Sequence, residues 1–146
     1  MAISKICTLC VEDLQAKIQT VPAFKNKVFF VYTQDKLYDK AMQLSFPCAG
    51  ILYEGLRSVP DADDRTAKGL STVFQASVIL LVSGSTIGNA EYNVQAVELL
   101  DQFRDAIKMT RSPANHFWKF MLETSVEARV DTYAYIQRWS TPILLT

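Results

Sequence analysis

The feature that most constrains the fold of this chain is an apolar stretch of ten residues, from Val73 to Val82. Eight of these ten side chains are apolar, and the β-branched and aromatic residues among them suit the pleated surface of a β-strand. Neither face of the stretch carries a continuous polar stripe, which is typical of a central strand covered on both sides. The stretch is too short to cross a bilayer as a helix. The remainder of the chain must therefore supply the elements that cover this strand.

Two amphipathic segments, one before the strand and one after it, are predicted to be helices that cover it. In the first, from Ile3 to Val21, apolar residues recur at steps of three and four until Pro22 ends the helix. In the second, the Asn89 side chain can cap the helix N-terminus, and Ser112-Pro113 marks the expected end. One face of this second helix is apolar: Tyr92, Ala96, Leu99, Leu100, Phe103 and Ile107.

Four further segments lie between the first helix and the central strand. The residues from Lys27 to Thr33 are mostly β-branched or aromatic and predict a strand. Gln34 to Leu44 keeps helical spacing and predicts a short helix, and Phe46 to Gly55 predicts another strand. Arg57 to Gly69 is rich in charged and turn-forming residues and predicts a loop. Because this loop is long for a hairpin, it is a candidate contact site.

The C-terminal part of the chain alternates in a way that predicts strands. From His116 to Leu122, the even-numbered residues are expected to share one face of a strand. Val126 to Val130 alternates apolar with charged residues. From Tyr133 to Trp139, odd-numbered and even-numbered residues are expected to point to opposite faces, and Pro142 follows the strand.

These elements predict one domain over residues 1–146, of the α+β class. Its sheet is expected to be mostly antiparallel with four to five strands, packed by the N-terminal helix and by the long helix after the central strand. The N-terminus lacks the pattern of a secretion signal, and no apolar run is long enough for a membrane helix. The count of three cysteines is odd, which is typical of a reducing compartment such as a cytosol.

Charge gives no support to nucleic acid or an anionic membrane as the main partner. The chain has 15 Lys and Arg and 15 Asp and Glu, so its formal net charge is zero. Chains without net charge tend to associate, which favours a protein partner.

The Cys7-Thr8-Leu9-Cys10 segment has the C-x-x-C spacing of zinc and redox sites. A structural zinc ion needs four ligands, and the remaining candidates are Cys48 and the single histidine, His116. A thioredoxin-like motif follows a strand, and none is predicted before Cys7. Both sulfurs fall on the apolar face of the first helix, so buried cysteines are expected. His116 is expected to lie at a sheet edge.

Two loops carry weak binding signals. Ser83 to Asn89 precedes a helix, as phosphate cradles do, but it lacks a Gly-Lys-Ser/Thr ending and a G-x-G-x-x-G pattern. A small-molecule-binding domain with an anion at this turn is therefore a second hypothesis. Asp61, Asp63 and Asp64 lack the Gly and the final Glu of a calcium loop. No catalytic, cofactor-binding or metal-ligating residue is predicted, and the chain is not predicted to be an enzyme.

Aromatic residues interleave with basic ones near the C-terminus. Such a pattern is found in single-stranded nucleic-acid sites, but it also describes strands that pack on a core and offer Trp and Tyr to a protein interface. The zero net charge favours the second interpretation. The residues concerned are Phe117, Trp118, Phe120, Tyr133, Tyr135 and Trp139, with Lys119, Arg129 and Arg138.

The order of these elements resembles that of the tail terminator proteins of tailed bacteriophages. The likeness extends over nearly the whole chain: a leading helix, the strand Phe46-Pro47-Cys48-Ala49-Gly50-Ile51-Leu52-Tyr53, the central strand and the long helix. Its most telling segment is the last, Tyr135-Ile136-Gln137-Arg138-Trp139-Ser140-Thr141-Pro142.

The resemblance implies a structural virion protein that is assembled in the host cytoplasm and is located in the tail. Such a subunit forms a homo-oligomeric ring of six copies in this family, which caps the tail tube, ends its polymerisation and provides the surface for head attachment. The implied partners are the tail tube protein, the sheath where the tail has one, and a neck or head-completion protein. DNA passes through the ring without sequence-specific binding, and no membrane or cofactor is involved. A head–tail joining or tail completion protein is the alternative.

Two regions are predicted to contact the neighbouring subunit or the tail tube. One is the Arg57 to Gly69 loop, and the other is the outward side of the last strand. A ring interface joins unlike surfaces and is rich in arginine and aromatic residues. The candidate residues are Arg57, Asp61, Asp63, Asp64, Arg65, Lys68, Arg138 and Trp139.

Overall fold

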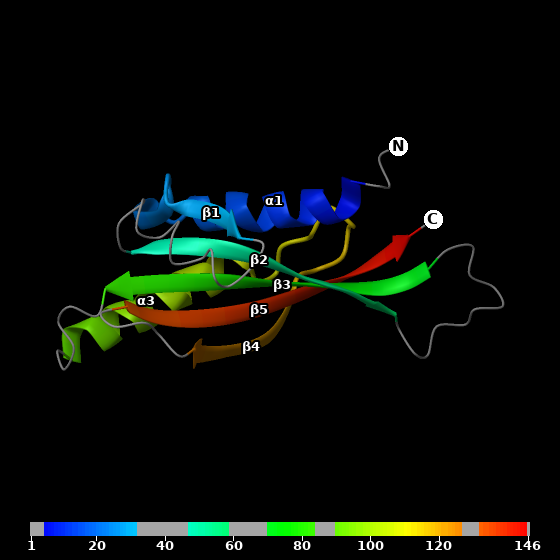
Figure 1. The fold of residues 1–146 in the computed structure, drawn as a ribbon. Helices are drawn as coiled ribbons and strands as arrows, with labels where there is room; N and C mark the ends of the chain where they lie inside the picture. The colour runs from blue at the N-terminus through cyan, green and yellow to red at the C-terminus, as the bar shows by residue number, and fades with distance from the viewer. Residues whose placement is uncertain (1–4, 32–46, 59–69, 84–89, 127–131, 146) are drawn as a thin grey trace.

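A computed structural model describes residues 5–31, 47–58, 70–83, 90–126 and 132–145 of this chain. In these ranges the chain forms two α-helices, a short 3-10 helix and one sheet of five strands (Figure 1). The elements, in chain order, are α1 (Ile6–Gln19), η2 (Pro22–Phe24), β1 (Val28–Val31), β2 (Cys48–Ser58), β3 (Leu70–Ser83), α3 (Ala90–Ile107), β4 (Lys119–Val126) and β5 (Thr132–Leu145).

The sheet has the strand order β1-β2-β3-β5-β4, so β3 is the middle strand of the five. β1 pairs parallel with β2, and the other three pairings are antiparallel. β3 contains the whole apolar stretch from Val73 to Val82 and extends beyond it at both ends. The predicted α+β class is confirmed at this level, and the sheet is mixed.

Both described helices pack on the same face of the sheet, which is called the helix face below (Figure 1). α1 contributes Cys10, Leu14 and Ile18, which are spaced by four residues. α3 contributes Ala96, Leu99, Leu100, Phe103 and Ile107, as its predicted apolar face requires. The even-numbered residues of β3 meet both helices from the sheet: Phe74, Ala76, Val78, Leu80 and Val82.

The opposite face of the sheet, called the outer face below, carries a second buried cluster. Ile79 and Leu81 of β3 point to this face because they alternate with the residues of the first cluster. The prediction that the central strand is buried on both faces is therefore confirmed for this end of β3. The other buried members are Phe29, Val31, Cys48, Ala134 and Ile136.

α3 ends at Ile107, five residues before the predicted end at Ser112-Pro113. Met109 has a positive φ of 58°, and the Thr110 amide donates to the Ile107 carbonyl, so the chain leaves the helix there. A glycine is the usual residue at such a position. Its absence removed the signal that marks this helix end in a sequence.

The prediction for His116 to Leu122 is wrong in two respects. β4 begins at Lys119, and His116 is an exposed residue of the preceding bend, not a strand residue at a sheet edge. Between Phe120 and Leu122, β4 contains one residue more than the segment of β5 that pairs with it, and this extra residue forms a β-bulge. Phe120 therefore pairs with Trp139 and faces the helices, whereas Leu122 pairs with Arg138 on the outer face.

β5 continues through Pro142 to Leu145, although the strand was expected to end before the proline. The described pairing with β4 ends at Ser140, so no described strand lies beside β5 at Pro142 on that side. A proline, which has no N–H to donate, is tolerated at such an edge. The alternation predicted from Tyr133 to Trp139 is confirmed, with Gln137 and Trp139 on the helix face.

Three predicted elements fall outside the described residues. These are the short helix over Gln34 to Leu44, the turn over residues 84–89 with the Asn89 cap, and the part of the predicted Val126 to Val130 strand after Val126.

Candidate functional site

The structure describes three of the eight residues predicted as contacts. Arg57 is not a loop residue, since it lies in β2 and pairs with Val73 of β3. Its side chain is exposed on the outer face. The predicted start of the loop is too early. A charged residue such as Arg57 and a turn-forming residue such as Ser58 are typical of loops, but here they are the last two residues of β2. The other five residues, Asp61, Asp63, Asp64, Arg65 and Lys68, lie outside the described residues.

Trp139 lies in the core, in contrast to the prediction that it faces outward with Arg138. Its side chain is 1% exposed. The Phe120 ring packs edge-on against it at 5.4 Å, and its Nε1 donates to the Gln137 Oε1 atom at 3.4 Å. Adjacent residues of a strand point to opposite faces, so Arg138 and Trp139 cannot share one surface.

Arg138 and Glu54 form an ion pair on the outer face. The Arg138 Nε atom donates to both carboxylate oxygens of Glu54, at 3.0 and 2.9 Å. The Ser77 hydroxyl of β3 also donates to this carboxylate. Glu54 points to this face by strand alternation, since Tyr53 before it pairs with Ala76 on the helix face. A bulge follows between Tyr53 and Gly55, where Gly55 takes a φ of +118°.

Beyond this ion pair the sheet narrows, because the pairing of β4 ends at Ser140 and only β2, β3 and β5 continue (Figure 1). On the outer face of this three-stranded part, one cationic side chain lies beside apolar side chains that are partly or largely exposed. Val73 pairs with both Arg57 and Pro142, and Leu144, which is 58% exposed, lies one row further along. We call Arg57, Val73, Pro142 and Leu144 the outer patch.

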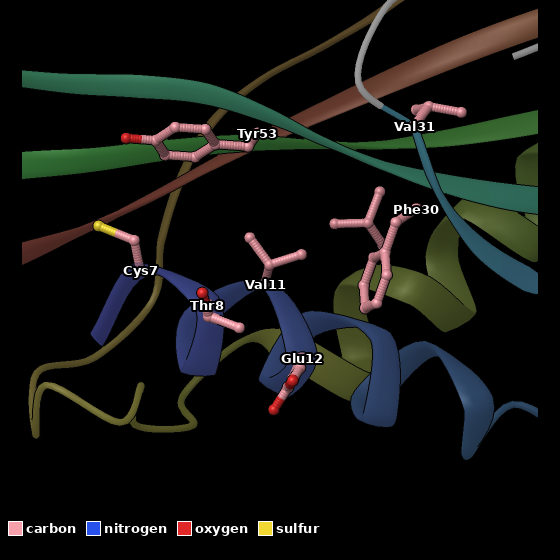
Figure 2. A pocket seen from close by; sticks show the side chains of 8 residues that line it. Cys7, Thr8, Val11, Glu12, Phe30, Val31 and Tyr53 are labelled. Atoms are coloured by element: carbon pink, nitrogen blue, oxygen red, sulfur yellow. The ribbon is translucent and has the colours of Figure 1, made fainter. Parts of the chain in front are cut away.

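A groove opens on the other side of the sheet, between α1 and the strands β1 and β2 (Figure 2). Its volume is about 350 Å³. Val11, Phe30 and Ile51 supply apolar walls, and the exposed carboxylate of Glu12 stands at its rim. We call this feature the α1–β2 groove, and its lining residues are Cys7, Thr8, Val11, Glu12, Phe30, Val31, Ile51 and Tyr53.

The two titratable groups at one end of the groove hold their protons more tightly than usual. Burial raises the pKa of the Cys7 thiol, although its contact with Tyr53 acts in the opposite direction. Burial also raises the pKa of the Tyr53 hydroxyl, and the neighbouring Cys7 adds to the effect. Figure 2 shows the sulfur and the hydroxyl pointing the same way from α1 and β2. Both groups are therefore neutral near pH 7, and neither is an activated nucleophile.

Sequence reasoning did not find this groove, because its lining comes from three separate elements. The only local signal was the pair Val11-Glu12, an apolar residue beside the acidic side of the predicted helix. The tilt of α1 relative to β1 and β2 determines whether these two side chains pack against the sheet or leave a groove. The periodicity of one helix does not predict that tilt.

A buried polar network connects α3 with the last two strands. The Gln137 side chain is fully buried, and its Nε2 atom donates to the Leu100 carbonyl at 2.8 Å and to the Glu123 Oε1 atom at 2.7 Å. Arg104 of α3 forms an ion pair with Glu123. This network satisfies the buried amide and fixes α3 over β4 and β5.

The cysteines do not form a metal site with one another. Cys10 is in the core of the helix face, Cys7 lines the groove, and Cys48 is buried on the outer face, so the sheet separates Cys48 from the other two. Within the described ranges, no group of three or more His, Cys, Asp or Glu residues is arranged to hold a metal ion. In the same ranges, no helix combines the length and the apolar character that a bilayer crossing requires.

Comparison of the chain with models of protein families gave no match. A search among curated proteins likewise found no relative.

Proposed function

We propose that this chain is a structural subunit of a phage tail, a tail terminator that forms a homo-oligomeric ring on the end of the tail tube. The observation that carries the proposal is the three-stranded extension of the sheet, whose outer face presents Val73, Pro142 and Leu144 beside Arg57. Val73, Pro142 and Leu144 lie next to one another on this face, and grouped exposed apolar side chains are typical of a surface that packs against another subunit.

The element order supports the proposal. A leading helix, a strand entered after Pro47, a long central strand, a long helix and a closing strand follow one another as in the tail terminator proteins that the sequence resembles. The closing segment has a defined role in the fold, since Gln137 and Trp139 hold the core and Arg138 holds β2. These features suit a rigid building block, and none of them requires a reaction.

The proposed partners follow from this role. The ring would contact the tail tube protein, and the sheath where the tail has one, on one side and a neck or head-completion protein on the other. DNA would pass through its lumen without sequence-specific contacts, which agrees with a chain of zero net charge. The site of action would be the tail of the virion, after assembly in the host cytoplasm.

Native mass spectrometry over a range of concentrations, with and without purified tail tubes, tests this proposal. We expect closed oligomers of one size, either free or bound to tube ends. A monomer that also fails to bind tube ends contradicts the proposal. Binding to the head connector without binding to tubes would instead identify a head–tail joining protein.

A further inference from the structure

The α1–β2 groove and the outer patch match each other in chemistry. The groove has apolar walls and a carboxylate, Glu12, at its rim. The outer patch has apolar side chains and a guanidinium, that of Arg57. An apolar contact with one pair of opposite charges at its edge is a common composition for a protein interface.

The two surfaces lie on opposite faces of the sheet. Ile51 and Tyr53 turn their side chains to the helix face, where Tyr53 pairs with Ala76 of the first core cluster. Arg57 pairs with Val73, which has the opposite orientation along β3. One molecule therefore cannot place its own outer patch in its own groove. Contact between the two requires a second copy of the chain.

We propose that the outer patch of one subunit docks in the α1–β2 groove of the next, with Arg57 opposite Glu12. This inference rests on the proposed ring and adds the contact that closes it. Because the two surfaces differ, the contact is head-to-tail, and its repetition by a rotation that closes gives a ring. Leu144, which projects from the patch, supplies the apolar group that enters between Val11 and Phe30.

The charge pair determines the register of this contact. Like charges facing each other across an interface strongly disfavour the contact, whereas an opposite pair at its rim contributes little affinity but excludes the wrong alignment. Reversal of either charge should therefore weaken assembly strongly, and reversal of both should restore it. Both residues are exposed, so the fold tolerates these substitutions.

The test uses the full chain and two variants, Glu12→Arg and Arg57→Glu. Each variant alone should need at least about a tenfold higher concentration for half-assembly than the wild type. An equimolar mixture of the two should assemble like the wild type, because every groove then meets a patch of opposite charge when the variants alternate. Such rings should contain equal numbers of the two chains, as native mass spectrometry can measure. If the wild type assembles only on tail tubes, the same comparison is made with tubes present.

Glu98→Arg on α3 and Lys25→Glu after η2 are the matched controls. Both residues are exposed, and these substitutions change the net charge by the same amounts as the test variants. The controls should assemble at the wild-type concentration. Equal weakening by the controls and the test variants would mean that net charge, not the proposed contact, governs assembly, and would overturn the inference.

The outcomes separate this inference from the proposed function. If the wild type forms rings while both variants also assemble normally, or while their mixture does not recover assembly, the contact is wrong and the ring remains. If the wild type forms no oligomer, alone or on tubes, both the contact and the ring function are wrong.

Discussion

Arg138 on β5 reaches across the central strand to Glu54 on β2, with its Nε atom 3.0 and 2.9 Å from the two carboxylate oxygens. Ser77 of β3 lies between them and donates to the same carboxylate. Three strands are thus linked through one side chain on the outer face. Glu54 lies on this face by alternation from Tyr53, which pairs with Ala76 on the helix face.

Substitution of Glu54 by Gln should lower the free energy of unfolding by about 1 kcal/mol, because it removes a partly exposed ion pair but keeps a hydrogen-bond acceptor. Urea denaturation measures the change, and Glu98→Gln on exposed α3 is the control. A double-mutant cycle with Arg138→Gln should give a coupling energy of similar size. Strict additivity of the two substitutions would show that the pair does not stabilise the fold.

Substitution of Gln137 by Leu should destabilise the fold by about 1–3 kcal/mol, because buried partners then lose their hydrogen bonds. The Gln137 amide donates to the Leu100 carbonyl and to Glu123 and accepts from Trp139. Glu123→Gln retains an acceptor for this amide and should cost less. The order of the two urea midpoints checks the prediction, and a larger loss for Glu123→Gln would contradict it.

Trp139→Ala should cost about 3–5 kcal/mol in stability, as expected for the removal of a fully buried aromatic side chain. Arg138→Ala, one residue away on the other face, should cost about 1 kcal/mol. Thermal unfolding of the two variants compares them directly. A Trp139→Ala variant that has normal stability but fails to assemble would contradict this prediction. It would support the interface position that was predicted for Trp139 from the sequence.

Burial raises the pKa of the Cys10 and Cys48 thiols to about 12. The unfolded chain loses these protons near the ordinary value of 9, whereas the folded chain retains them. The folded state then binds more protons, so stability should fall as pH rises from about 9 toward 12. Urea denaturation at several alkaline pH values measures this loss, and Cys48→Ala should show a shallower decline. An equal slope in this variant would contradict the assignment.

The same burial predicts the reactivity of the thiols. At pH 8, an aromatic disulfide reagent should modify Cys7 in the native protein, because its side chain is only partly buried. Cys10 and Cys48 should react only after unfolding in urea. Rapid reaction of all three thiols in the native protein would show that the core opens more easily than the packing indicates.

The features that the sequence predicted best are those that depend on local periodicity. Leu14 and Ile18 of α1, and Leu99 and Phe103 of α3, repeat at helical steps and are buried as expected. The apolar run of β3 likewise identified the middle strand. In each case the spacing of apolar residues within one element is enough to predict which of its faces is buried.

Features that depend on contacts between distant segments were not predicted. The bulge before Leu122 reverses the face of every later residue in β4, and no residue type marks it. The parallel pairing of β1 with β2 and the packing of both helices on one face arise from the whole assembly of elements. The same holds for the candidate site. Arg57 was expected in a loop but shares the outer face of the sheet with Arg138, and the groove with Glu12 forms only where α1 meets two strands.

The position of the protein in the virion is the measurement that tests the central claim most directly. In electron cryomicroscopy of intact tails carrying a tagged copy of this chain, we predict one ring of density at the head-proximal end of the tail tube. Tails assembled without the protein should lack that ring and should vary in length. Density along the tube, density at the distal tip, or normal capped tails in the absence of the protein would contradict the assignment as a tail terminator.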